Sequence, residues 1–158
     1  MYAYSKEEGN LSHDILAKVY SRGIDKLHLF SENLGATEAT ELAEAFKVNS
    51  TITKLDLSNN FIQDTEATAL AEAFKVNSTI TDLDLSWNNI GDKGTTELAN
   101  ALAVNSSLRS LNLYNNDTGP ESATVLAQTL KVNSSIRSLN LSGNGVNSVI
   151  KLRDLFLK

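Results

Sequence analysis

The sequence contains no cysteine, a single proline and no long apolar run, and each shortage excludes a class of protein. Without cysteine, a disulfide framework, a thiolate nucleophile and a cysteine-ligated metal are excluded. With Pro120 as the only proline and no Pro/Gly/Ser-rich stretch, no flexible linker separates two domains. No run of about 20 apolar residues is available to span a membrane, and the polar N-terminus is unlike a signal peptide. These absences predict one cytoplasmic domain.

The composition is that of a soluble globular protein. The 158 residues are 41% apolar and 21% charged, which suffices for one domain with a sizeable core. The formal net charge is −5. Because nucleic acids and anionic membranes attract basic surfaces, we expect neither as a partner. A protein partner with Lys or Arg patches suits this charge better.

A repeat of 28 residues runs through the chain without a slip. Residues 24–29 (IDKLHL) return as 52–57 (ITKLDL), 80–85 (ITDLDL), 108–113 (LRSLNL) and 136–141 (IRSLNL). In every copy the first, fourth and sixth positions are apolar. The Leu-x-Leu alternation is typical of a β-strand with one buried face. The sequence therefore predicts a stack of strands, one per repeat.

Three residues after the last leucine, copies two to five carry an asparagine: Asn60, Asn88, Asn116 and Asn144. This pattern resembles the leucine-rich repeat, L-x-x-L-x-L-x-x-N-x-L, and its length is similar to that of the ribonuclease-inhibitor-like class. The resemblance implies an α/β fold. It would be a right-handed solenoid, a short horseshoe with parallel strands on the concave face and helices on the convex face. It also implies that the four asparagines form a ladder of bonds to backbone groups of their own and the neighbouring repeat.

Two positions depart from the family pattern. Glu32 stands where the first copy would carry the asparagine, which suits an end repeat because the ladder has no upstream neighbour there. Thr118 replaces the apolar residue found at the equivalent positions Ile62 and Ile90. We expect a looser turn around Thr118.

The second half of each copy has the spacing of an amphipathic helix. Apolar residues fall at i, i+3, i+4 and i+7, as in Ala67, Leu70, Ala71 and Phe74. Asparagine tolerates the left-handed backbone conformation that often terminates a helix. We therefore expect the helices to end in that conformation at the recurring asparagines, which are Asn49, Asn77, Asn105 and Asn133.

The two ends of the chain break the pattern, as terminal repeats of a solenoid do. We expect one domain over residues 1–158. In it, residues 1–23 form a capping half-repeat with one helix, and residues 24–146 form about five repeats. Residues 147–158 form a C-terminal helix, which either caps the solenoid or marks the chain as a fragment of a longer array.

The outward-facing strand positions vary between copies, whereas the helix half is nearly constant. Residues 37–53 and 65–81 differ only at Glu41 against Ala69. Residues 26–36 and 54–64 differ at most positions. The contrast indicates either specialisation of the strand face for a partner or drift after duplication.

Several outward-facing residues are candidates for contact with a protein. Asp56 and Asp84 would lie side by side, and because like charges across strands are mildly destabilising, we expect them to await a cationic group unless neighbours offset them. Large aromatic side chains are common interface anchors. The candidate set is His28, Phe30, Lys54, Asp56, Asp82, Asp84, Trp87, Arg109, Asn112 and Tyr114.

These observations predict a non-enzymatic protein-binding module that uses its concave strand face. Two alternatives stay open. One is a regulator of a small GTPase, because the repeats of this chain resemble those of the activating protein for Ran. The other is a structural protein that self-associates through the exposed ends of the solenoid. The sequence offers no nucleophile–base pair, metal-ligand set or phosphate-binding loop, so we expect no catalytic residue, metal or cofactor.

Overall fold

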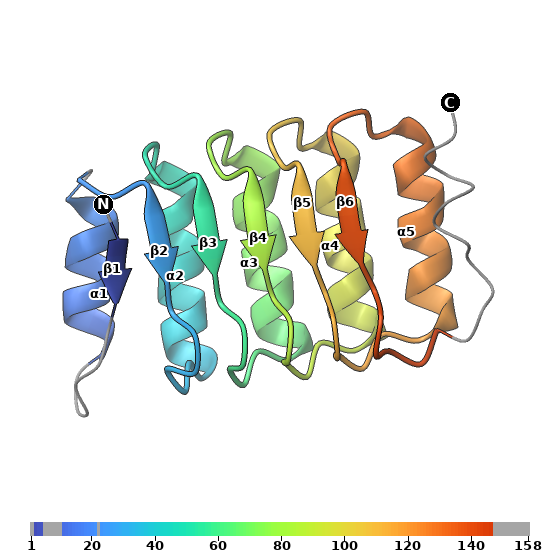
Figure 1. Ribbon diagram of the computed structural model, residues 1–158, viewed down its shortest axis with the longest axis horizontal. Coiled ribbons are helices and arrows are strands. Elements are labelled where there is room, and N and C mark those ends of the chain that lie inside the picture. The colour runs from blue at the N-terminus through green and yellow to red at the C-terminus, as the bar shows by residue number, and fades with distance from the viewer. Residues whose placement is uncertain (1, 5–10, 22, 147–158) are drawn as a thin grey trace.

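The computed structural model describes residues 2–4, 11–21 and 23–146, which form two layers (Figure 1). One layer is a six-stranded parallel sheet, and the other consists of the helices that connect the strands. Strand order follows chain order, so each repeat contacts the repeats before and after it. The predicted α/β solenoid is confirmed. The C-terminal helix expected in residues 147–158 lies outside the described residues.

The strands are short and keep the register that the 28-residue period dictates. Leu27 pairs with Leu55, and Leu55 pairs with Leu83. The sequence analysis did not predict the first strand, because it expected residues 1–23 to contain only a helix. The strands are β1 (Tyr2–Tyr4), β2 (Lys26–His28), β3 (Lys54–Asp56), β4 (Asp82–Asp84), β5 (Ser110–Asn112) and β6 (Ser138–Asn140).

The helices lie parallel to one another behind the sheet (Figure 1). Their apolar stripes face the strands, since residues such as Leu70 and Phe74 are buried together with Leu55 and Leu57. The helices are α1 (Leu11–Tyr20), α2 (Ala36–Val48), α3 (Asp64–Val76), α4 (Asp92–Val104) and α5 (Pro120–Val132). Within the described part of the chain, none of them has the length and apolar character needed to span a bilayer.

The turn at Thr118 is tightly packed, contrary to the expectation of a looser turn. Thr118 and Thr95 are both fully buried, and their hydroxyl groups are 3.0 Å apart, within hydrogen-bonding distance. The equivalent positions one repeat earlier hold Ile90 and Ala67, which are also buried. Two polar departures from the apolar pattern therefore satisfy each other inside the core.

The helices end in a different way from that expected. Asn77, which follows α3, has φ −67° and ψ 131°, so its backbone is extended and not left-handed. Its side-chain nitrogen donates hydrogen bonds to the carbonyls of Phe46 and Asn49 in the previous repeat, while its side-chain oxygen accepts from the amides of Thr79 and Ile80. The helix-end carbonyls, which have no partner inside the helix, are thus satisfied from the next repeat.

The same arrangement recurs at the other helix ends. Asn49, Asn105 and Asn133 also have extended backbones. Each donates to a carbonyl near the end of the preceding helix, the acceptors being Val19, Phe74 and Leu102. These four residues form a second asparagine ladder, whereas the sequence analysis predicted them only as the ends of helices.

Candidate functional site

A shallow groove of about 420 Å³ crosses the outer face of the sheet from β2 to β6. Its charged residues lie on β2 to β4, whereas β5 and β6 contribute serine and asparagine. The sequence prediction had selected six of the residues that line it. They are His28, Lys54, Asp56, Asp82, Asp84 and Asn112.

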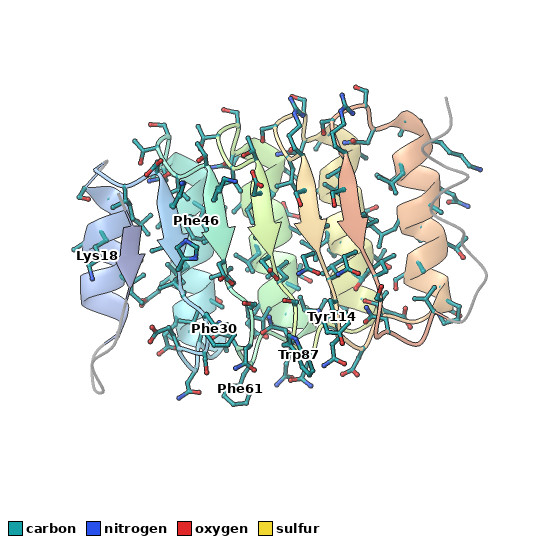
Figure 2. All side chains as sticks on the ribbon, viewed as in Figure 1. Lys18, Phe30, Phe46, Phe61, Trp87 and Tyr114 are labelled. Atoms are coloured by element: carbon teal, nitrogen blue, oxygen red, sulfur yellow. The ribbon has the colours of Figure 1, made fainter. Side chains whose placement is uncertain are left out.

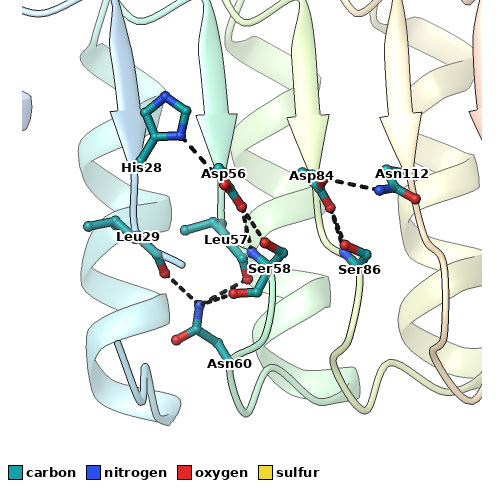
Figure 3. A network of polar contacts seen from close by, with 9 residues as sticks. All are labelled: His28, Leu29, Asp56, Leu57, Ser58, Asn60, Asp84, Ser86 and Asn112. Carbon is teal, nitrogen blue, oxygen red and sulfur yellow. Dashed lines mark hydrogen bonds and ion pairs between the residues drawn. The ribbon is translucent and has the colours of Figure 1, made fainter. Parts of the chain in front are cut away.

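Asp56 is the centre of a polar network on this face (Figure 3). One of its carboxylate oxygens lies 3.5 Å from Nδ1 of His28. The other accepts hydrogen bonds from the backbone amide and the hydroxyl of Ser58, two residues further on. The carboxylate therefore stabilises the turn that follows β3.

Asp84 repeats this role one strand along. Its Oδ1 accepts from the amide and hydroxyl of Ser86 at 2.9 and 2.6 Å, and its Oδ2 accepts from the side chain of Asn112 at 3.0 Å (Figure 3). Asn112 in turn accepts from the amide of Tyr114. Neighbouring groups therefore offset the two carboxylates, which is the alternative left open by the sequence analysis, and a cationic ligand for Asp56 and Asp84 stays a prediction.

The remaining charges of the face are also engaged. Lys54 Nζ lies 3.4 Å from Asp82 Oδ1, and both side chains are about half-exposed. Arg109 donates to the carbonyl of Ser106 at 2.8 Å. Such exposed pairs contribute little to stability, so these side chains can exchange their partners for a ligand at small cost.

The first asparagine ladder lies where the strands end. Asn60 is buried, and its side-chain nitrogen donates to the carbonyls of Leu29, Leu57 and Ser58 (Figure 3). Its oxygen accepts from the amides of Glu32 and Leu34 in the previous repeat. Asn88, Asn116 and Asn144 make equivalent bonds.

The edge of the sheet at which the strands end carries a row of aromatic residues. We call the loops 30–35, 58–64, 86–92 and 114–119 the carboxyl edge. Figure 2 shows Phe30, Phe61, Trp87 and Tyr114 along this edge, below the strands. Phe30 and Phe61 are each 58% exposed and Trp87 is 52% exposed, while Tyr114 is half-buried. The groove does not include these four side chains.

Phe61 was missed by the sequence reading, which followed only the outward positions of the strands. A comparison of the position after the ladder asparagine would have found it. That position holds Asn33, Asn89, Asp117 and Gly145 in the other copies. Only the second copy places a large apolar residue there.

Trp87 occupies an unusual backbone position. Its φ is +57°, in the left-handed region that bulky residues disfavour. The equivalent positions also have positive φ, but they hold Ser31, Asn59, Asn115 and Gly143. The indole ring meets Tyr114 edge-on, with ring centroids 5.4 Å apart. The tryptophan is thus exposed and locally strained, two properties that fold stability does not require.

The two edges of the sheet carry opposite charge. The carboxyl edge contains Glu32, Asp64, Asp92 and Asp117, with no Lys, Arg or His. Burial raises the pKa of Glu32 above its ordinary value. At the opposite, amino edge, residues 47–53, 75–81, 103–109 and 131–137 contain five Lys or Arg residues and no Asp or Glu, while Asp25 lies at this edge in the first copy.

Comparison with protein families agrees with this architecture. The model of the Leucine Rich repeat family matches residues 48–71, 76–99 and 132–149. The matched segments contain the strands β3, β4 and β6 and the ladder asparagines Asn60, Asn88 and Asn144. The chain is a leucine-rich-repeat protein.

Two solved structures share the leucine-rich-repeat fold. The actin-binding site 2 of leiomodin-1 superposes with a TM-score of 0.76 at 24% identity, covering 84% of this chain and 79% of the other. The tropomodulin C-terminal domain of Caenorhabditis elegans gives a TM-score of 0.78 at 16% identity, covering 91% of this chain and 87% of the other. No curated protein matches the chain in sequence. At these identities the similarity is one of fold, so a binding surface must be argued from this chain's own residues.

Proposed function

We propose that this leucine-rich-repeat protein is a protein-binding module and that its partner binds along the strand face. The observation that carries the proposal is the uneven distribution of charge in the groove. Lys54, Asp56, Asp82 and Asp84 line one half, and the uncharged Ser110, Asn112, Ser138 and Asn140 line the other. A face that needed only to be soluble could have the same residues in every repeat. A cytoplasmic location remains a prediction.

Actin is the first partner to assay, because the leiomodin-1 domain with the same fold is an actin-binding site. We expect the protein to sediment with actin filaments or to retain a specific protein from a cell lysate. Stimulation of GTP hydrolysis by a small GTPase would instead favour the regulator alternative. Association of the protein with itself alone, measured by light scattering at several concentrations, would favour the structural alternative.

The repeat supplies a strand-face variant with little risk to the fold. The substitutions K54S, D56N, D82S and D84N give β3 and β4 the residues of β5 and β6. The turn bonds should survive, because Asn112 and Asn140 already accept from the amides of Tyr114 and Ser142 in the way that the two aspartates accept. We expect this variant to lose the partner while its circular dichroism and unfolding midpoint stay close to those of the wild type.

The control is the double variant E44Q/E72Q on the helices. Glu44 and Glu72 are exposed and pair with Lys47 and Lys75 on the opposite side of the molecule. Both variants make the net charge more positive by 2, since the first removes three carboxylates and one ammonium and the second removes two carboxylates. Equal retention of the partner by both variants would refute binding at the strand face.

A further inference from the structure

We infer that the carboxyl edge is a second docking surface, and that it binds an extended, arginine-rich segment of a partner protein. The surface consists of the aromatic cluster Phe30, Phe61, Trp87 and Tyr114 together with the acidic loop residues around it. It is separate from the strand-face groove, so this inference goes beyond the function proposed above.

The first argument is that the aromatic side chains are not needed by the core. Phe46 and Phe74 fill the space between sheet and helices and are buried. Phe30, Phe61 and Trp87 instead expose more than half of their surface. Apart from Tyr114, which is equivalent to Phe30, the other repeats hold serine, asparagine, aspartate or glycine at the same positions. Contiguous exposed apolar side chains are typical of binding surfaces, and aromatic residues are typical anchors within them.

The second argument is that the four aromatic residues lie in the loops of four consecutive repeats. The backbone amides of Ser31, Asn59 and Trp87 donate to the carbonyls of Ser58, Ser86 and Tyr114, so each loop is bonded to the next. Adjacent strands are about 4.8 Å apart, and four of them therefore span roughly 14 Å. An extended segment advances about 3.3 Å per residue. About five residues of a partner would run along the whole cluster.

The third argument, charge complementarity, identifies the occupant. The loops that hold the aromatic residues carry four carboxylates and no basic side chain. Asp117 is exposed, whereas Asp92 accepts from the amide of Gly119 and Asp64 from the amide of Gly94. Lys93, in the first turn of α4, is the nearest lysine along the chain. A cationic segment suits this edge and an anionic segment does not.

Arginine fits the surface better than lysine. Its planar guanidinium group stacks on aromatic rings and at the same time donates paired hydrogen bonds to a carboxylate. A lysine ammonium group has the charge but not the planar face. The loops of this edge carry both rings and carboxylates, so they offer both interactions to arginine side chains.

Trp87 is the only tryptophan in the chain, so its fluorescence reports on this surface directly. The probe is a 12-residue peptide in which arginine and serine alternate, at low and at moderate salt. We expect saturable quenching or a shift of the emission, weakened at least threefold by salt. An alternating lysine peptide should bind more weakly, and an alternating glutamate peptide should leave the emission unchanged.

Variants are compared through the fluorescence anisotropy of the labelled arginine peptide. The triple variant F30S/F61N/W87N takes each new residue from an equivalent position, namely Ser58, Asn89 and Asn59. We expect at least a tenfold loss of affinity. The control V48T/V76T/V104T alters three valines that are at least 62% exposed at the amino edge, and it should bind as the wild type does.

Three results would overturn the inference. The first is equal affinity of the triple variant and the wild type. The second is the absence of saturable binding of the arginine peptide at low salt. The third is a concentration-dependent dimer that sedimentation detects in the wild type but not in the triple variant, because a second copy would then be the occupant of the edge.

Discussion

The two edges of the sheet are built on the same principle but have diverged in different ways. At each edge one asparagine per repeat satisfies backbone groups of its own and the preceding repeat, as Asn88 does at the carboxyl edge and Asn77 at the amino edge. At the amino edge the residues around the ladder are nearly constant. At the carboxyl edge they include exposed aromatic residues that differ between repeats. Buried backbone must be satisfied in every repeat, so variation is confined to positions that the ladders do not use.

The largest effect is expected from the loss of a ladder residue at the carboxyl edge. Asn88→Ala would leave two amides and up to three carbonyls of buried turns without their partner. We expect the free energy of unfolding, measured with urea, to fall by about 3 kcal/mol. Asn89→Ala is the matched control, since this exposed neighbour should change the value by less than about 0.5 kcal/mol. Similar values for the two variants would contradict the structural role of the ladder.

A somewhat smaller effect is expected at the amino edge. Asn77→Ala removes bonds to two carbonyls and two amides, so we expect a loss of about 2 kcal/mol. Ser78→Ala, at the exposed position beside it, provides the reference. If Asn77→Ala left the free energy of unfolding unchanged, the extended backbone at the helix end would not depend on the Asn77 side chain. The amino edge, unlike the carboxyl edge, would then not need its asparagine for stability.

The buried threonine pair tests a polar exception to the apolar pattern of the core. Thr118→Ile leaves the hydroxyl of Thr95 buried without its partner, which we expect to cost about 1–2 kcal/mol. Adding Thr95→Ala recreates the combination of Ala67 and Ile90, and stability should return to the wild-type value or above. Additive losses in a double-mutant cycle would show that the two hydroxyl groups act independently.

Exchanging residues between repeats tests the strain at Trp87. Asn59→Trp places a bulky residue at a φ of +53° and should lower the free energy of unfolding by about 1 kcal/mol. Trp87→Asn should raise it by about 0.5 kcal/mol, because relief of the left-handed strain exceeds the loss of the ring contact with Tyr114. A loss of stability in Trp87→Asn would mean that the tryptophan serves the fold and not a partner.

The smallest effect concerns pH. The hydroxyl of Ser122, followed by the backbone amides of Ser122 and Gly119, holds the pKa of Asp92 below its ordinary value. A carboxyl group with a lowered folded-state pKa stabilises the fold above its unfolded pKa, and this contribution is lost as pH falls through the folded value. Below about pH 4, Asp92→Asn and Ser122→Ala should therefore lose stability less steeply than the wild type in urea titrations. If the free energy of unfolding fell equally steeply with pH in the variants and the wild type, these hydrogen bonds would not favour the charged form of Asp92.

The sequence by itself determined the architecture of the described repeats. The 28-residue period, the Leu-x-Leu strands and the helical stripes specify which residues face the core. The reason is that the spacing of apolar residues along the chain sets on which face of a strand or helix they lie. The same columns identified the side chains that line the strand-face groove. β1 escaped detection because it does not carry the repeat pattern.

Only the tertiary structure decided how the polar residues are used. Asp56 and Asp84 accept hydrogen bonds from the amides of the turns that follow them, and the hydroxyl groups of Thr95 and Thr118 pair with each other. The helix-end asparagines donate to carbonyls of the previous repeat. The aromatic cluster likewise forms only when loops about 28 residues apart are stacked. A side chain's type shows that it can donate or accept a hydrogen bond, but its partner depends on which groups the stacked neighbours bring within reach.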